Sequence, residues 1–248
     1  MLRMLLIFAS VSLVMLPANS PSITSGWRAI EREFQSAVQV WTIEENMPKY
    51  LCSGVAIAPD VIVTASSCVA SETTIFVSTH LELDFNLPLT QALQSVSAIA
   101  RKGIKHHEAD FMLIFLSQAL KLEPAMLLSI NESFQIRLLD QVIIAGFGFD
   151  NPPKELSRFE RITEKFFGSE QHREHGKKII AKSNIFSVSA KEISLGRSPE
   201  DGAACSGDEG APVFAHIDTP SANSQRVIGI IAASPLLDNC AQPSRSKT

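Results

Sequence analysis

The chain has 248 residues, of which 45% are hydrophobic and 19% are charged, and this composition excludes general disorder and a multi-span membrane protein. The 22 Lys and Arg residues against 26 Asp and Glu residues give a formal net charge of −4, so the chain has no basic field with which to hold nucleic acid. The length suits either one large β domain or two small lobes.

Residues 1–20 are predicted to be a secretory signal peptide. Arg3 is the only charge among them, an apolar run follows over residues 4–16, and Pro17 and small residues end it; this order is typical of such peptides. As a helix the run is about 20 Å long, too short for a hydrocarbon core of about 30 Å. A buried N-terminal helix is the alternative. We therefore expect a secreted, extracellular protein without a membrane span, whose folded domain occupies residues 21–248.

Short apolar runs rich in Val, Ile and Phe alternate with turns along the rest of the chain and predict strands. The predicted strands are residues 38–43, 54–58, 61–65, 74–78, 111–116, 142–146, 179–181, 185–188, 211–215 and 227–233. Helical periodicity is weak, and residues 87–100 and 158–165 are the candidates for short helices. So many short strands predict an all-β sandwich or barrel. A break near residues 118–130 could join two lobes, at about 36–120 and 130–241.

The chain contains four cysteines: Cys52, Cys68, Cys205 and Cys240. In an oxidising compartment they suggest two disulfides, for which three connectivities are possible. No pair has C-x-x-C spacing, which argues against a structural zinc site. Asn131-Glu132-Ser133 is an N-glycosylation sequon, although such a tripeptide also occurs by chance. The most charged stretch is residues 158–182, where a solvated loop is favoured over a heparin- or partner-binding patch.

Three segments carry a family resemblance. Residues 52–54 and 64–68 read C-S-G and T-A-S-S-C, residues 109–114 read A-D-F-M-L-I, and residues 205–212 read C-S-G-D-E-G-A-P. In this order and at this spacing they resemble the trypsin/chymotrypsin-like serine protease family over about residues 36–241. The resemblance implies an all-β fold of two antiparallel, six-stranded-type barrels, chymotrypsin-like, with the family's C-terminal strand and helix truncated.

The chemistry of that family needs a serine nucleophile, a histidine base and an aspartate that orients the histidine. At the matching positions this sequence has Ser67 in place of the histidine, Asp110 as the retained aspartate, and Glu209 in place of the serine. Losing such a triad costs about 10⁶-fold in turnover in subtilisin. The resemblance therefore implies a serine protease homologue without catalytic His and Ser. Such a pseudoprotease would regulate extracellular proteolysis by binding a protease, an inhibitor or a cascade component.

The resemblance also assigns the positions around the lost triad. The backbone N–H groups of Gly207 and Glu209 match an oxyanion-hole-like pair, which the Glu209 carboxylate could fold back to fill. The specificity-pocket-like positions are Ala203, Ala232 and Ser234. Their small, uncharged side chains offer no ion pair to a Lys or Arg of a substrate.

The cysteine pairing of the family implies the disulfides Cys52–Cys68 and Cys205–Cys240. Asp208 matches the aspartate that, in the family, pairs with the new N-terminal amine after activation cleavage; its partner in this chain is left open. A carboxylate left buried at this position needs other hydrogen bonds.

Two further expectations concern the retained acids. With the histidine lost, burial is expected to raise the pKa of Asp110; the alternative is that backbone N–H groups keep it ionised. The runner-up function is an enzyme with unorthodox Glu/Asp chemistry on Glu209 and Asp110, or with residual serine-type endopeptidase activity, and a third reading is a decaying paralogue with no selected role. Two carboxylates are too few for a tight metal site, so we expect no metal and no cofactor.

Overall fold

The computed structural model of the chain describes residues 23, 25–69, 74–85, 87–148, 176–189, 191–196, 200–205, 207–219 and 223–233. Several features predicted from the sequence lie outside these residues: the signal peptide 1–20, the helix 158–165, Ser234 and Cys240. Strands dominate the described part of the chain, which confirms the all-β prediction.

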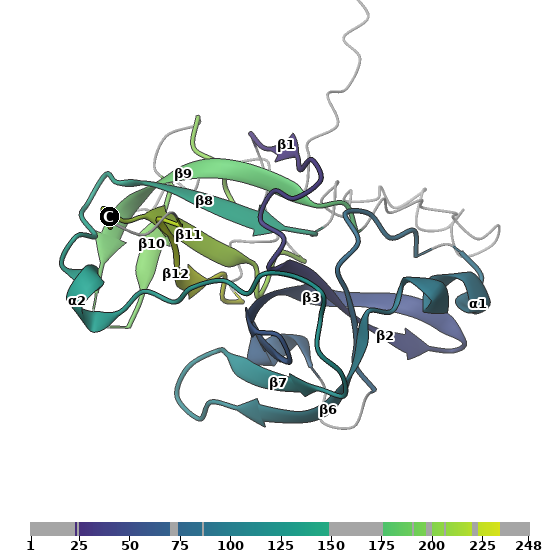
Figure 1. Cartoon of the computed structure of the whole chain (residues 1–248). Helices are drawn as coiled ribbons and strands as arrows, with labels where there is room; N and C mark the ends of the chain where they lie inside the picture. Colours follow the sequence, from purple (N-terminus) through teal and green to yellow (C-terminus); the bar gives the residue numbers. More distant parts are fainter. Residues whose placement is uncertain are drawn as a thin grey trace, which may run out of the picture.

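The first half of the described chain forms a closed antiparallel barrel with the strand order β2-β3-β4-β7-β6-β5. Its strands are β2 (Ala37–Glu44), β3 (Met47–Ala58), β4 (Val61–Thr64), β5 (Phe76–Ser78), β6 (Ala98–Lys105) and β7 (Met112–Leu116). Alternation decides which side chains enter the barrel: in β7, Met112, Ile114 and Leu116 are buried and the residues between them are less so. The barrel occupies the lower right of Figure 1.

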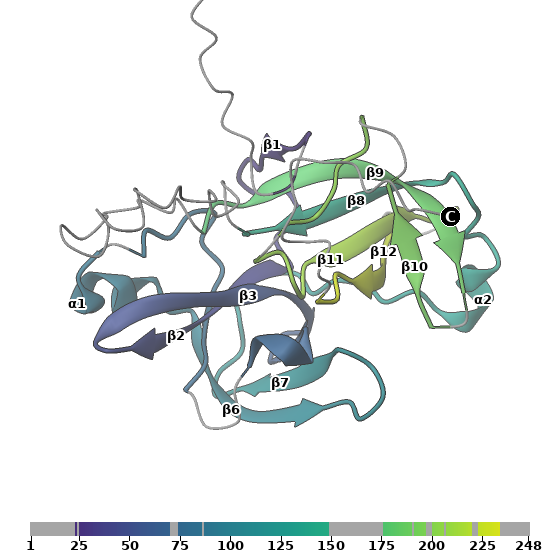
Figure 2. The same cartoon turned by 180° about the vertical axis from the view of Figure 1, so that it is seen from behind.

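The second half forms a sheet with the order β1-β9-β8-β11-β12, and β10 also pairs with β9. Its strands are β1 (Trp27–Arg28), β8 (Gln141–Gly146), β9 (Ile179–Val188), β10 (Ile193–Leu195), β11 (Pro212–His216) and β12 (Gln225–Ile230). All the strand pairs are antiparallel. Figures 1 and 2 show this sheet beside the barrel, with the chain between β7 and β8 running from one to the other.

Helices in the described residues are short: η1 (Ser66–Cys68), α1 (Leu89–Ala92), η2 (Leu93–Ser95) and α2 (Ile130–Ser133). The helix predicted over residues 87–100 is therefore only partly right. Its helical turns end at Ser95, and the chain enters β6 at Ala98, because this segment pairs with both β5 and β7. Weak local helical propensity yields to pairing on two sides.

Strand lengths also differ from the sequence prediction. β9 unites the two strands predicted at 179–181 and 185–188, because its first part pairs with β8 and its last part with β10. β3 begins at Met47 rather than residue 54, since it pairs with β2 as far as the turn between them. The short strands β1 and β10 have no distinct sequence pattern and depend on β9 as a partner.

Candidate functional site

The carboxylate of Asp110 is the centre of a hydrogen-bond cluster between the barrel and the second sheet. Asp110 is partly buried in the connection from β6 to β7. Its Oδ1 accepts hydrogen bonds from Ser66 Oγ at 2.8 Å and Ser67 N at 2.7 Å. Its Oδ2 accepts hydrogen bonds from Ser67 Oγ at 2.9 Å and Ala233 N at 2.9 Å. Because Ala233 follows β12, this carboxylate ties the two sheets together.

The helical turn η1, which carries both serines, is held from two sides. A disulfide joins Cys68 of η1 to Cys52 of β3, with the Cα atoms 5.9 Å apart, so the predicted Cys52–Cys68 pairing is confirmed. From β6, Lys105 Nζ donates hydrogen bonds to Ser66 O at 3.0 Å and Val69 O at 2.6 Å. These contacts position the two hydroxyls of η1 against Asp110.

The environment of Asp110 lowers its pKa. Burial acts to raise the pKa, but the N–H of Ala233, the hydroxyl of Ser66, and the N–H and hydroxyl of Ser67 all lower it and outweigh burial. Donors to a carboxylate favour its ionised form. The raised pKa that we expected is therefore wrong. That expectation counted only the lost imidazole. The alternative, that backbone N–H groups keep Asp110 ionised, is right in direction, and the hydroxyls of Ser66 and Ser67 add to the effect.

The Glu209 side chain turns back onto its own loop. Its Oε2 accepts a hydrogen bond from Gly207 N at 2.7 Å, and its carbonyl oxygen accepts one from Ser53 N at 3.0 Å. The next residue, Gly210, has a φ of 78°, and a Cβ there would clash with Ser53 O and Thr64 Oγ1. A glycine is required at this position because the loop packs directly on the barrel.

The neighbouring Asp208 is fully buried, and its carboxylate accepts hydrogen bonds from backbone N–H groups. Its Oδ1 accepts a hydrogen bond from Gly148 N at 2.9 Å, and its Oδ2 accepts one from Cys205 N at 2.9 Å. A Cβ on Gly146 or on Gly148 would clash with this carboxylate. The two glycines therefore let the end of β8 approach the acid closely enough to satisfy it.

The remaining predicted site positions differ in their exposure to solvent. Ala203 and Ala232 are exposed, and Gly207 is buried. Cys205 is in a disulfide, while Cys240, its predicted partner, and Ser234 lie outside the described residues. Asn131 of the sequon is exposed on α2.

The end of the charged stretch 158–182 corrects the expectation of a solvated loop, because Lys178 is buried beside Phe147 and directly precedes β9. The Lys178 side chain is only 2% exposed. Its Nζ donates a hydrogen bond to Phe34 O at 3.1 Å and lies 5.3 Å from the centre of the Phe147 ring. Burial lowers the pKa of Lys178 to about 8, because the charged form is poorly solvated there.

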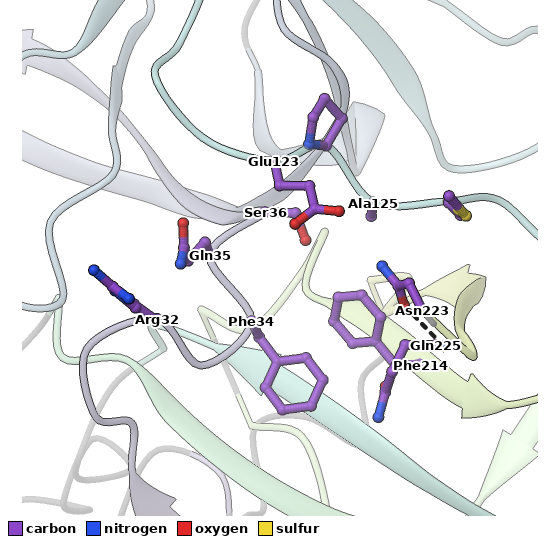
Figure 3. Close-up of a pocket in the computed structure, with 11 residues that line it drawn as sticks. Arg32, Phe34, Gln35, Ser36, Glu123, Ala125, Phe214, Asn223 and Gln225 are labelled. Atoms are coloured by element: carbon purple, nitrogen blue, oxygen red, sulfur yellow. Dashed lines mark hydrogen bonds between the residues drawn. The ribbon is translucent and has the colours of Figure 1, made fainter. Parts of the chain in front are cut away.

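Phe34 also lines a groove of about 250 Å³ where the segment before β2 meets β11 and the chain between β7 and β8 (Figure 3). The rings of Phe34 and Phe214 lie 4.8 Å apart. Phe34 and Arg32 have φ angles of 44° and 74°, a region that non-glycine residues seldom occupy. Neither the groove nor these unusual φ angles were predicted from the sequence.

Within the described ranges, no three His, Cys, Asp or Glu side chains gather where they could hold a metal ion. No helix in that part of the chain is long and apolar enough to cross a membrane.

Comparison with models of protein families matches the trypsin family over residues 23–247. No individual curated protein matches the chain. The family match begins at Ile23, which is fully buried in the core of the second sheet. The match and the closed barrel beside a second sheet together confirm the chymotrypsin-like fold expected from the sequence.

Proposed function

We propose that this chain, which belongs to the trypsin family, has lost proteolytic activity and acts in the extracellular space by binding another protein. The observation that carries the proposal is the hydrogen-bond cluster around Asp110. Every donor in that cluster is a serine hydroxyl or a backbone N–H, and none of these groups can take up a proton near neutral pH.

Hydrolysis by a serine nucleophile needs a base whose pKa lies near the working pH. At the family's histidine position, Ser67 Oγ donates to Asp110 Oδ2 at 2.9 Å. The hydrogen bonds to Asp110 lower its pKa and move it further from neutrality, so this carboxylate is a weak base for a hydroxyl proton. The cluster supports a structural role for Asp110 rather than a catalytic one.

The position of the family's nucleophile carries a carboxylate instead of a hydroxyl. Glu209 Oε2 accepts the hydrogen bond of Gly207 N, one of the two donors that the family resemblance assigns to the oxyanion hole. Such donors favour negative charge, and here the protein's own carboxylate uses one of them. A tetrahedral oxyanion would have to displace Glu209 and would meet its negative charge.

The surface around Asp110, Glu209, Ala203 and Ala232 matches the family's substrate cleft by resemblance, and we call it the cleft. In our proposal it binds a protein while lacking this chemistry. Ala203 and Ala232 are exposed, small and uncharged, so they suit a partner that presents apolar or small side chains rather than Lys or Arg. The partner classes that fit a trypsin-family scaffold are a protease, an inhibitor or another component of a proteolytic cascade. Enzyme chemistry on Glu209 and Asp110 is the runner-up, and cleavage of a peptide substrate without fluorophosphonate labelling would favour it.

The activity test uses purified full-length chain, a fluorophosphonate probe, and peptide substrates with basic, aromatic or small residues before the scissile bond. We expect no labelling and no cleavage, with an active trypsin-family enzyme as the positive control. The double variant Ser67→His with Glu209→Ser restores the residue types of the triad. We expect little recovery, because Ser66 and Ala233 still hold Asp110. Stoichiometric labelling of the wild-type cleft would contradict the proposal.

The binding test is affinity capture from the native secretion, followed by identification of the bound protein. We expect Ala232→Arg, at the edge of the cleft, to weaken that complex at least tenfold in Kd. The matched control Thr90→Arg lies on the exposed surface of α1, away from the cleft, and should bind like the wild type. If both variants bind equally well, the cleft is not the binding surface.

A further inference from the structure

The helix α2 shows its polar side to the protein and its apolar side to water. On the inner side, Arg226 Nε donates to Glu132 Oε1 at 2.9 Å, and Arg226 is buried. On the outer side, Ile130 is 84% exposed and Phe134, directly after α2, is 82% exposed. Residues four apart lie on one face of a helix, so these two side chains form one exposed apolar face, which we name the α2 face.

The chain after α2 continues this exposure. Leu138 and Leu139 are also exposed, and Leu139 adopts a φ of 70°, where a leucine is rarely found. Its N–H donates a hydrogen bond to Ile185 O at 2.8 Å, which fixes the backbone in this conformation. Four large apolar side chains are thus exposed within residues 130–139. Single scattered ones need no explanation, but a group of them indicates a surface that something covers.

We infer that an N-linked oligosaccharide on Asn131 covers the α2 face. Asn131 begins the only N-x-S/T sequon of the chain, and it lies on α2 between Ile130 and Phe134. At about 100° of rotation per residue, Asn131 is beside Phe134 around the helix. A sugar attached there starts at the border of the exposed apolar face. The inference depends on the secretion that the proposed function includes.

The surroundings of Asn131 suit this attachment. The helix start is held by other residues: Ser129 Oγ accepts from Glu132 N at 3.3 Å, and Glu132 Oε2 accepts from Ser129 N at 2.9 Å. Within the described residues, the Asn131 side chain makes no hydrogen bond, so a sugar on its Nδ2 displaces no contact of the fold. A glycan is bulky and hydrated, and an exposed position is the only kind that can hold one.

The chemistry of a sugar ring matches such a face. The C–H groups of a pyranose ring can pack on Ile130 and on the Phe134 ring, which removes apolar area from water, while its hydroxyl groups stay hydrated. The transfer itself is balanced: Asn131 Nδ2 bonds to the anomeric carbon of an oligosaccharide carried on a lipid diphosphate. The bond from that carbon to the diphosphate oxygen breaks, the lipid diphosphate leaves with the electron pair, and the amide gives up one proton.

The test begins with the full-length chain secreted from eukaryotic cells. Peptide mapping before and after treatment with an N-glycosidase should find a glycan on Asn131, and the enzyme should convert that residue to Asp. Asn131→Gln should abolish the modification. The matched control Ser133→Thr keeps the sequon and should keep the glycan.

Coverage is measured separately, by the fluorescence of a dye that binds exposed apolar surface. We expect the fluorescence to rise several-fold in Asn131→Gln and in enzymatically deglycosylated wild type, and to stay low in Ser133→Thr. Adding Ile130→Glu and Phe134→Glu to Asn131→Gln should return it to the low level, which assigns the signal to the α2 face.

Three outcomes would overturn the inference. If the chain is secreted with Asn131 unmodified, the inferred glycan does not exist. If the dye signal is unchanged after deglycosylation, the glycan does not cover the α2 face. Retention of an unglycosylated chain inside the cell overturns the inference together with the secretion in the proposed function. A glycosylated, covered protein whose cleft binds no partner would contradict the proposed function alone.

Discussion

The cleft and the buried end of β8 differ in how many hydrogen-bond partners they offer to a charged side chain. In the cleft, Asp110 is only partly buried and receives four hydrogen bonds. At the end of β8, Lys178 is almost fully buried, and its ammonium group has one carbonyl acceptor, on Phe34, and the face of Phe147. Both pKa values are lowered, but for an acid this favours the charged form, and for a base it disfavours it.

The buried end of β8 also shows that burial alone does not decide the outcome. Asp208 is as buried as Lys178, yet two backbone N–H groups face its carboxylate. Glycines at 146 and 148 make this approach possible. A charge inside the fold is therefore well accommodated where the backbone supplies several partners and poorly accommodated where it supplies one.

The largest expected loss of stability comes from replacing a glycine that lies against the Asp208 carboxylate. Gly148→Ala places a Cβ against the Asp208 carboxylate and should lower the free energy of unfolding by about 2–3 kcal/mol. Urea unfolding measures it. Gly229→Ala in β12 is the matched control, because a Cβ there meets nothing within 4 Å, and it should change stability by less than about 1 kcal/mol. Equal stability of the two variants would show that Asp208 does not depend on the close approach.

The next prediction concerns the buried ammonium group. Lys178→Met removes a charge that burial disfavours and should stabilise the protein by about 1–2 kcal/mol at pH 7, as measured by urea unfolding. The lost hydrogen bond to Phe34 O opposes part of this gain. Lys182→Met is the control, because Lys182 is exposed, and it should have little effect.

The stability difference between wild type and Lys178→Met should depend on pH, and the lowered pKa of Lys178 sets the direction of that dependence. Below a pH of about 8 the lysine is charged in both the folded and the unfolded state, so the penalty of burial is constant. Between about 8 and the ordinary value of 10.5 the unfolded state binds more protons, so wild-type stability rises with pH. The advantage of Lys178→Met should therefore shrink across this window. An advantage independent of pH would show that charge burial is not its cause.

A smaller effect is expected in the cleft. Asp110→Asn should lower stability by about 1 kcal/mol at pH 7, because an amide cannot accept all four hydrogen bonds and because water screens this partly exposed site. The folded-state pKa lies below the unfolded value of 3.8. The stabilisation is therefore complete above that value and is lost as the pH falls through the folded pKa.

Urea unfolding at several pH values checks this prediction, and the difference between wild type and Asp110→Asn should vanish at low pH. Asp60→Asn, in the exposed turn between β3 and β4, is the control and should change stability at pH 7 by less than about 0.5 kcal/mol. An Asp110→Asn variant more stable than wild type at pH 7 would restore our original expectation of a raised pKa.

The smallest expected losses of stability come from removing the hydroxyl of Ser66 or of Ser67. Ser66→Ala and Ser67→Ala should each lower stability by about 0.5–1 kcal/mol, with the larger loss for Ser66, which is less exposed. In the Asp110→Asn background both losses should shrink, because the hydroxyls then have a weaker acceptor. A double-mutant cycle measures this coupling, and a coupling near zero would mean that the serines act elsewhere.

Local patterns in the sequence were sufficient for a large part of the fold. Short apolar runs between turns predicted most strands of the barrel and of the second sheet, although not β1, β6 or β10. The order of the motifs led to the family that the family-model match supports. The family's cysteine pairing correctly predicted the Cys52–Cys68 disulfide. Such features depend on residue types within one segment or on spacing along the chain, which the sequence contains directly.

The electrostatic character of the site was not readable in this way. The donors on Asp110 include Ala233, which is 123 residues away in the chain, and the surroundings of Lys178 include Phe34, 144 residues away. The pKa of a group depends on which backbone N–H and C=O groups the fold brings within about 3 Å. The sequence therefore determined the strands and the residue types at the cleft, while only the tertiary structure decided which charges are satisfied, because those partners come from distant segments.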